Sequence, residues 1–397
     1  MSSLTDFRPE FDNSYQDTFL KTLVSKEIMN TRFESTLRFG QSVERVAFDI
    51  SGVVVRDVTR GADSTIDTIS DSSELLTINL EKEAVFRISD GEVTQAGPLN
   101  PGENIGQDVA HKVAQDLDFK CFAEVRNAAN TFDNGDLTTL VSTGTPITLS
   151  ATTVPQMTTR MAAKLRRKEN QEVSMNMALV VDSYAAADIE QYLMGKDIDI
   201  AGSVFKNGYA GVVRNAVMYI SENLTGEVTQ VVDVATADEV VTILGVTFTA
   251  KATPSTAGEF DIAGSVDAQG AIMANMINGA ATGQDTATGY FEVSDADRAI
   301  LTEAGIVATY VDATDTLTIT GAGRLEFTTD MSGAVVEWLN CYFGKKGAID
   351  LVVQDLSPVD MRTESRQRAT VVFSSYLAGI KTFADGAKKF VQVKIAV

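Results

Sequence analysis

Cysteine and histidine are scarce in this sequence, and each scarcity excludes a class of chemistry. The 397 residues include two cysteines, Cys121 and Cys341, far apart in the chain. This spacing offers neither a disulfide framework nor a CxxC metal motif, so we expect two core thiols. His111 is the only histidine. It lies away from the apolar stripe of a predicted helix, which indicates a surface or interface residue instead of a catalytic base or a metal ligand.

Basic residues are also few. Lysine and arginine number 33 against 54 aspartates and glutamates, a formal net charge of −21. Such a chain is not expected to coat nucleic acid through a basic surface. No apolar run approaches the roughly 18 residues of a membrane-spanning helix. The opening MSSLTDFRPEFDNSYQ lacks the basic and apolar regions of a signal peptide, so the sequence predicts a cytoplasmic product.

Motifs of catalysis are missing as well. The sequence contains no GxSxG, and FGKKG does not fit a phosphate loop because Leu339 stands where its first glycine is required. Neither Asp295 with Asp297 nor Asp312 with Asp315 has the spacing of a twelve-residue calcium loop. We therefore predict no catalytic, cofactor-binding or metal residues and no enzyme activity. The KLRRK run at 164–168 is expected to form a charged helix face or intersubunit salt bridges.

The acidic charge is concentrated in one region. Residues 225–330 hold 16 acidic residues and the bases Lys251, Arg298 and Arg324, which leaves −13 there and −8 for the rest of the chain. Short alternating segments and two helix-like stretches in this region predict a small α+β domain. The segments on either side of it resemble buried strands that lack partners of their own. We therefore expect an inserted domain within a host fold.

Two helices stand out in the host. Apolar residues recur every four positions over 102–130, which predicts a helix roughly 40 Å long with Asn104 as its N-cap. A second helix is expected from Pro155 to about Glu169, followed by a buried strand at 177–181 and a helix at 184–194.

The segment 40–99 differs in kind. It alternates Val, Ile and Thr with polar residues and contains no Trp, Tyr, Met or Cys. Two strands of about 15 residues would make a ribbon roughly 50 Å long, with the polar stretch TRGADSTIDTISDSSE at its tip. An isolated two-stranded ribbon is marginally stable in water. We expect a neighbouring subunit to supply the missing contacts.

The order of these pieces resembles the HK97-type major capsid proteins of tailed double-stranded DNA bacteriophages. The segment VVVRDVTRGADSTIDTISDSSELLTINLEKEAVFRISDGEVTQAG is similar to the extended E-loop of that family, and IGQDVAHKVAQDLDFKCFAEV to its spine helix. VPQMTTRMAAKLRRKENQEVSMNMALVVDSYAAADI and GYAGVVRNAVMYISENL resemble parts of its axial domain. VDMRTESRQRATVVFSSYLAGIKTF resembles its returning peripheral strands.

The resemblance implies an α+β, HK97-like fold. The segments it implies are an N-terminal arm (1–39), an E-loop (40–100), a peripheral domain with the spine helix (101–152), a first axial part (153–224), the inserted domain (225–333) and return strands (334–397). Intersubunit contacts are expected at Phe7, Phe11, Tyr15, Arg56, Arg60, Asp63, Asp71, Glu74, Arg87, Arg362 and Glu364.

The function implied is that of a major capsid protein forming the pentamers and hexamers of an icosahedral phage head, assembled in the host cytoplasm. Its expected partners are other copies of the chain, a portal protein, a separate scaffolding protein, a decoration or cement protein, and packaged double-stranded DNA held weakly. No membrane contact, cofactor or removed propeptide is expected. Two alternatives stay open. One is an encapsulin-type cellular shell protein. The other is a secreted acidic β-rich surface protein, which the missing signal peptide argues against.

Overall fold

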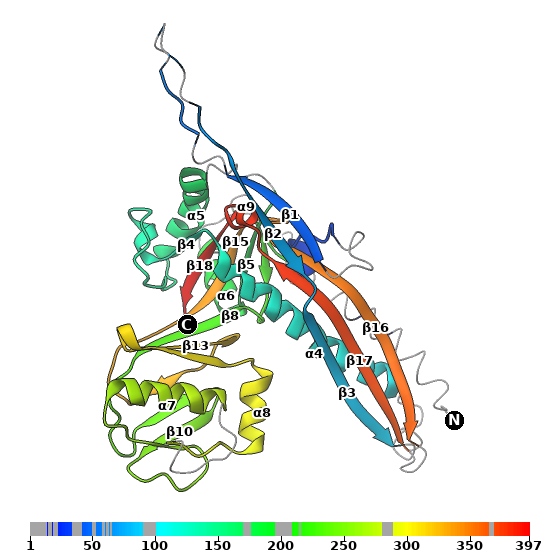
Figure 1. The fold of residues 1–397 in the computed structure, drawn as a ribbon, viewed down its shortest axis with the longest axis vertical. Coiled ribbons are helices and arrows are strands. Elements are labelled where there is room, and N and C mark those ends of the chain that lie inside the picture. Colours follow the sequence, from blue (N-terminus) through cyan, green and yellow to red (C-terminus); the bar gives the residue numbers. More distant parts are fainter. Residues whose placement is uncertain are drawn as a thin grey trace. The chain divides into compact units, whose positions relative to one another are not determined.

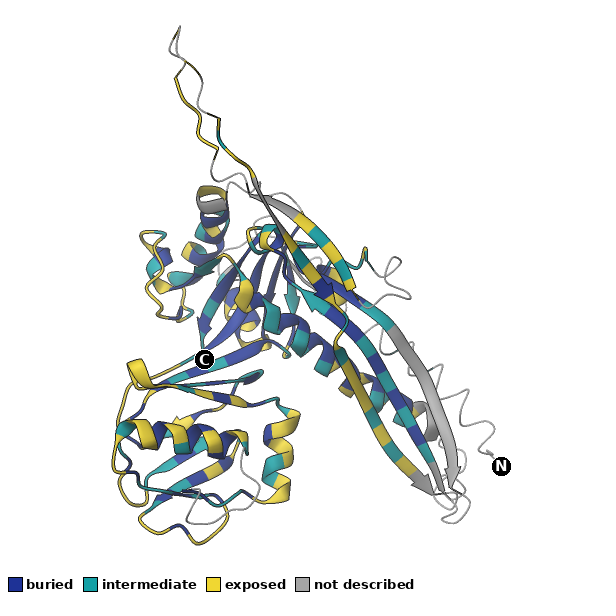
Figure 2. Ribbon diagram, in the orientation of Figure 1, coloured by how far each residue is buried: buried dark blue, intermediate teal, exposed yellow. Residues whose placement is uncertain are grey.

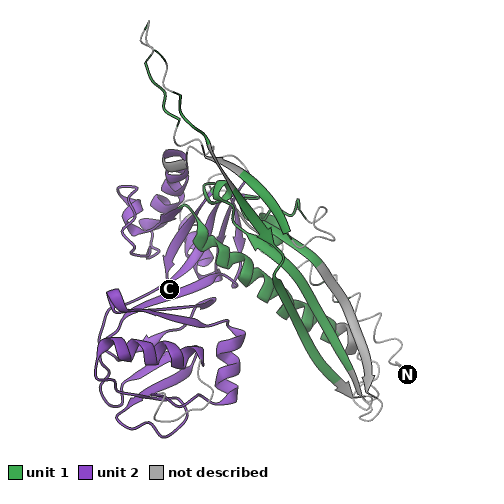
Figure 3. Cartoon of the chain, in the orientation of Figure 1, with its two compact units in different colours: residues 1–129, 346–389 green, residues 130–345, 390–397 purple. Residues whose placement is uncertain are grey.

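The computed structural model describes residues 14, 18, 23–33, 42–49, 53–57, 60, 63, 66–89, 101–169, 176–194, 209–213, 216–279, 289–364 and 369–397. Helices and strands are both abundant, so the predicted α+β class is confirmed. The chain divides into two compact units, residues 1–129 with 346–389 and residues 130–345 with 390–397 (Figure 3). The predicted segment boundaries do not coincide with this division and stay predictions.

Unit 1 is built around a long helix and a three-stranded antiparallel sheet of order β16-β17-β3 (Figure 1). A separate antiparallel pair, β1 with β2, forms the ribbon. Its helices and strands are α2 (Ser25–Ile28), β1 (Ser42–Asp49), β2 (Ser70–Thr77), β3 (Leu80–Ser89), α4 (Pro101–Ala123), η2 (Glu124–Asn127), β16 (Asp350–Glu364), β17 (Ala369–Lys381) and α9 (Ala384–Ala387).

Helix α4 is the predicted long helix, but with different ends. It begins at Pro101, a favoured first residue of helices, so the predicted N-cap Asn104 is wrong because that residue lies inside the helix. Its 23 residues span about 35 Å. The buried face of α4 contains Ala110, Val113, Ala114, Leu117 and Cys121, and Val125 of η2 is buried just beyond it. His111 is exposed, as predicted.

A buried carboxylate on α4 fixes the N-terminal segment. Asp118 accepts hydrogen bonds from the backbone N–H of Val24 and Ser25, both at 3.1 Å, and from the Ser25 hydroxyl. Burial raises the pKa of Asp118 to about 6, against the effect of these donors. Because the folded chain then holds the proton more tightly than the unfolded chain, this group favours folding most below pH 4 and progressively less as the pH rises through 6.

Unit 2 contains a large mixed sheet of order β12-β13-β8-β15-β5-β7-β6, with β18 and β4 joined to it through β15, and a four-stranded sheet of order β11-β10-β9-β14. Its elements are β4 (Asn130–Phe132), η3 (Asn134–Leu137), α5 (Thr153–Glu169), β5 (Met177–Val181), α6 (Ser183–Met194), β6 (Tyr209–Val213), β7 (Ala216–Ile220), β8 (Thr225–Val231), β9 (Val240–Ile243), β10 (Val246–Lys251), β11 (Glu259–Asp261), α7 (Val266–Asn278), α8 (Asp295–Glu303), β12 (Val307–Val311), η4 (Asp312–Thr314), β13 (Thr316–Ala322), β14 (Thr328–Thr329), β15 (Val335–Lys345) and β18 (Phe390–Ala396).

The acidic region has a hydrophobic core of its own. All buried members of this cluster lie between Val228 and Met331, with Phe248, Phe260 and Met273 fully buried among them. Its strands nevertheless continue the sheet of the host. One side of β15 pairs first with β8 and then with β5, while β18 pairs with its other side. The region is therefore a separate core that shares one strand with its surroundings.

An ion pair ties the same two parts together. The guanidinium of Arg324 contacts the buried carboxylate of Asp182 at 2.7 and 2.8 Å and lies 4.5 Å from the ring centroid of Tyr184. Within the acidic region, Gly323 lies next to Arg324 and approaches β8 closely, because a Cβ on Gly226 would lie 2.1 Å from the carbonyl oxygen of Gly323. The joint thus combines shared strand pairing with a partly buried charge pair.

Lys164 departs from the prediction for the basic run 164–168. Its side chain is 3% exposed, and its Nζ lies 2.6 Å from both carboxylate oxygens of the fully buried Asp136. Lys164 also donates to the Ser142 hydroxyl at 2.7 Å and to the carbonyl of Thr131. This residue organises the loop 131–144 and does not belong to a solvent-facing charged surface.

Replacing Lys164 with methionine should therefore destabilise unit 2. Asp136 would stay buried without its cation, and breaking such a pair costs about 3–5 kcal/mol. Urea unfolding followed by the fluorescence of Trp338, the only tryptophan and a residue of unit 2, measures the change. Arg167→Met on the exposed side of α5 is the matched control and should change stability little. Equal effects of the two variants would contradict this account.

Candidate functional site

The ribbon formed by β1 and β2 has two different faces. All eight residues of each strand pair in register, from Ser42 opposite Thr77 to Asp49 opposite Ser70. On one face Leu76 is fully buried and packs in a cluster with Val352 and Phe383. The other face carries Val46 and Leu75, each 52% exposed. Exposed positions alternate with less exposed ones along the described part of both strands (Figure 2).

A clamp of two side chains holds the base of this ribbon. Arg45 of β1 and Glu74 of β2 are cross-strand partners, and both reach the segment 383–385. Arg45 Nη2 lies 2.5 Å from Asp385 Oδ2, with its guanidinium carbon 5.1 Å from the ring centroid of Phe383. The backbone N–H of Ala384 donates to Glu74 Oε2 at 3.0 Å. Both strands of the ribbon are thus fastened to one short segment.

The charges around the clamp favour its ionised form. Partial burial works to raise the pKa of Asp385, but Lys389 and Arg45 outweigh it and hold that pKa below its usual value. The neighbouring Asp350 responds in the opposite direction, since burial raises its pKa against the hydrogen bond from Asn30 and the charge of Arg45. The ion pair of Arg45 with Asp385 therefore persists at neutral pH.

Gly379 allows the ribbon to cross β17 at close range. A Cβ at this position would lie 2.7 Å from the carbonyl oxygen of Thr77 and 3.2 Å from the Cα of Ile78. Just beyond this crossing the chain enters β3, which pairs with β17 and not with β1. The paired part of the ribbon is therefore shorter than the sequence-based expectation for 40–99, because residues 80–89 belong to the three-stranded sheet.

The distal part of the ribbon is held by a second ion pair. Arg56 contacts Asp67 through two parallel hydrogen bonds of 2.6 and 2.8 Å, and the backbone N–H of Val54 donates to Asp67 at 2.9 Å. Around this pair the apolar side chains face solvent: Val55 is 99% exposed and Ile66 is 90% exposed. Exposed apolar residues in such a row are typical of interaction surfaces.

The outer face of the three-stranded sheet is also apolar in part. Val85 of β3 lies opposite Phe373 of β17 and is 47% exposed. Val371, Phe373 and Leu377 alternate with the buried residues of β17 and are half-buried. Tyr376, on the other face, donates to Asp116 of α4 at 2.5 Å. One face of this sheet therefore meets α4, and the opposite face presents apolar side chains.

The predicted contact residues fall into three groups. Phe7, Phe11 and Tyr15 lie outside the described residues. Arg56 and Glu74 bind Asp67 and the Ala384 amide within the chain, so whether either also contacts a second subunit stays a prediction. The others occupy exposed or strand positions: Arg60 and Asp63 in the distal ribbon, Asp71 in β2, Arg87 in β3, and Arg362 and Glu364 in β16.

Sequence reasoning missed three residues that shape this surface. Arg45, Asp67 and Asp385 make the ion pairs of the ribbon, yet none belongs to a motif. Arg45 and Asp385 lie 340 positions apart, and no local pattern connects them. The alternation of β1 could have placed Arg45 on the same face as Val43, which was the only available signal.

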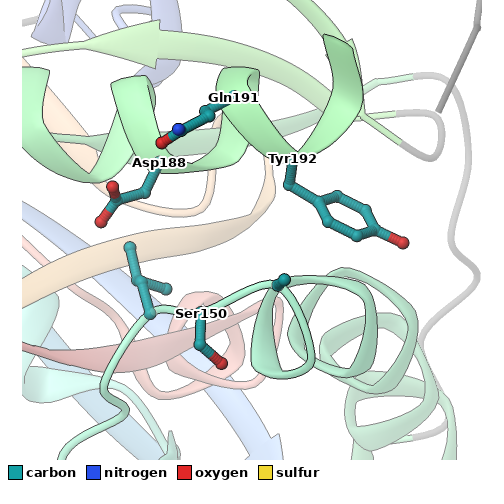
Figure 4. A pocket seen from close by; sticks show the side chains of 6 residues that line it. Ser150, Asp188, Gln191 and Tyr192 are labelled. Carbon is teal, nitrogen blue, oxygen red and sulfur yellow. The ribbon is translucent and has the colours of Figure 1, made fainter. Parts of the chain in front are cut away.

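A pocket of about 280 Å³ lies between α6 and the segment before α5. Asp188 and Tyr192 extend from α6 toward the side that carries Ser150 (Figure 4). The lining is mixed, with Leu149 and Ala151 beside the polar residues, and it contains no histidine or cysteine. Within the described ranges, no three His, Cys, Asp or Glu residues are grouped to hold a metal ion. No helix in that part of the chain is long and apolar enough to cross a membrane.

Comparison with known proteins gives structural matches. No family model and no curated protein matches this sequence. A structure from Mycobacterium phage Che8 is 14% identical with a TM-score of 0.44, covering 94% of this chain and 90% of that one. The capsid of Ralstonia phage GP4 is 9% identical with a TM-score of 0.46, over 93% and 86%. The mature capsid of bacteriophage PhiM1 is 10% identical with a TM-score of 0.41, over 90% and 82%.

The solved structures that this chain resembles are phage capsids.

Gly379→Ala should loosen the ribbon at its base. The added methyl group would meet backbone atoms of Thr77 and Ile78, and such overpacking costs about 1–3 kcal/mol. Hydrogen exchange measured by mass spectrometry should become faster in β1 and β2. Gly264→Ala is the control, because a Cβ there meets nothing within 4 Å. Unchanged exchange in the ribbon of the Gly379 variant would show that the crossing tolerates a side chain.

Proposed function

We propose that this chain is the major capsid protein of a tailed double-stranded DNA phage, and that it assembles into the pentamers and hexamers of an icosahedral head. The observation that carries the proposal is the ribbon, which is anchored at its base and exposes apolar side chains along its length. Burying a Val, Ile or Leu side chain stabilises by roughly 1.5–3 kcal/mol. A ribbon with this composition is suited to packing on another subunit.

The surface that would receive the ribbon is the outer face of β3 and β17 on a second copy. Its residues Val85, Phe373 and Leu377 are apolar, as are Val46 and Leu75 on the ribbon. Glu81, Glu83 and Arg87 lie on the same face of β3 as Val85 and would pair with charges near the ribbon. Several such weak contacts made at once multiply through effective concentration, so a closed shell can be stable.

The charge distribution supports a shell that holds DNA weakly. Outside residues 225–330 the net charge is only −8, and the KLRRK run at 164–168 is short, so we expect few contacts with phosphates. The inserted domain carries −13 and is suited to the outside of a particle, where a decoration or cement protein could bind it. Portal and scaffolding proteins would complete assembly in the bacterial cytoplasm before the chain becomes part of the virion.

The second candidate is an encapsulin-type shell of the same fold. The two functions differ in what the particle contains, since a phage head encloses DNA and a cellular compartment encloses an enzyme. Nuclease-protected double-stranded DNA in purified native particles supports the proposed function. A packaged enzyme without DNA would favour the alternative.

Shortening the ribbon should abolish assembly and leave the subunit folded. Deleting residues 53–69 joins Gly52 to Ser70 and leaves a three-residue loop that ends in glycine, a length compatible with a β-hairpin. Sedimentation and negative-stain microscopy should detect a soluble subunit and no shells, while the intact chain forms them. Shells of normal shape from the shortened chain would contradict the role of the ribbon.

A photo-crosslinking residue in place of Leu75 should join two copies of the chain. We expect mass spectrometry to map the crosslink to peptides from 80–89 or 369–381 of the second copy. A crosslinker in place of Ile300, which is 44% exposed on α8, is the control and should give no such product. Crosslinks from position 75 to other regions would overturn the proposed receiving surface.

A further inference from the structure

The ribbon is not one continuous ladder. Strand pairing between β1 and β2 ends at Asp49 and Ser70. If the same register continued, Asp67 would lie opposite position 52, but its carboxylate instead binds the backbone of Val54 and the guanidinium of Arg56. Among the described residues, the two limbs of the distal ribbon are therefore joined by side-chain bonds and not by strand pairing.

The contact between the limbs is built from several cooperating bonds. Asp67 accepts three hydrogen bonds, two from Arg56 and one from Val54, and Arg56 also donates to the carbonyl of Val54 at 3.3 Å. Two parallel hydrogen bonds between guanidinium and carboxylate fix relative orientation as well as distance. The Arg56 and Val54 bonds hold the pKa of Asp67 below its usual value, so the contact is intact at neutral pH and is lost only in acid.

We propose that Arg56 and Asp67 form a staple that sets the shape of the distal ribbon before a second copy of the chain binds it. This inference rests on the proposed function, because the bound surface is that of another subunit. The staple positions Val55 and Ile66, the most exposed apolar residues of the two limbs. In this proposal Arg56 acts inside its own subunit, and the predicted contact of Arg56 with a second subunit stays a prediction.

The physical reason for such a staple is the entropy of docking. A flexible loop must be ordered when it binds, and ordering costs conformational entropy for each immobilised side chain and for the backbone. A segment already held in its bound shape avoids much of that cost. An exposed pair contributes little to the stability of the subunit itself, so its effect should appear in assembly.

Charge reversal tests the staple in the unassembled chain. Nitroxide labels at Val53→Cys and Ile69→Cys report the distance between the limbs, and the native cysteines are both fully buried. Pulsed electron spin resonance should give a narrow distance distribution for the parent chain. Arg56→Asp or Asp67→Arg alone should broaden it at least about twofold, and the R56D/D67R double variant should restore the parent width. Arg60→Asp, the same charge change on the same limb, should leave the width unchanged.

The same variants, without labels, then test the consequence for assembly. Each single reversal should slow particle formation at least about fivefold, and the double variant should assemble within about twofold of the parent. Single variants with unchanged widths, or a double variant that stays broad, would overturn the staple. A double variant with a restored width but no assembly would instead assign Arg56 to the neighbouring subunit. If the parent chain forms no particles, the proposed function fails, while the distance measurement still decides whether the staple exists.

Discussion

The proposed assembly surface depends on the contacts that Arg45 and Glu74 of the ribbon make with residues 383–385. Arg45 and Glu74 stand opposite each other in the ladder and fasten both strands to the same segment, so the ribbon cannot pivot on one strand alone. Gly379 adds a backbone crossing at van der Waals range. With its base fixed in this way, the burial of Leu76 on one face leaves Val46 and Leu75 on the other. The apolar outer face is thus a consequence of how the base is held.

In unit 2, strand β15 joins the acidic region to the surrounding fold. It pairs with β8 of the acidic region and with β5 of the surrounding fold along one side, and with β18 along the other. The acidic region keeps its own hydrophobic core, yet β8 would lose one of its two strand partners if the region were excised. Arg324 would also leave the carboxylate of Asp182 buried without its cation. A hydrophobic core of its own is therefore not the same property as the ability of the acidic region to fold alone.

Periodic burial made part of the fold predictable from the sequence. Helices α5, α6 and α7 and strand β5 lie where apolar spacing indicated, because their own residues decide which side is buried. Strand β3 was assigned to the ribbon since alternation looks the same whichever strand pairs with it. The sequence predicted a charged helix face or intersubunit salt bridges for Lys164, because its partner Asp136 is distant in sequence and comes close only in the folded chain. The ion pair of Arg56 with Asp67 was not predictable for a similar reason, because it lies beyond the paired residues of β1 and β2 and follows from no sequence motif.

The distribution of charge limits where binding free energy can come from. All three bases of the acidic region are engaged in ion pairs, Lys251 with Asp238, Arg298 with Glu292 and Arg324 with Asp182, so its acidic excess is left to face solvent. Copies of this region brought together would repel each other, although salt at physiological strength screens charges beyond about 8 Å. Attraction between subunits must then come from elsewhere. The exposed apolar side chains of the ribbon and of the outer face of β3 and β17 belong to unit 1 and lie outside the acidic region, so they are the surfaces on which we place contact between copies.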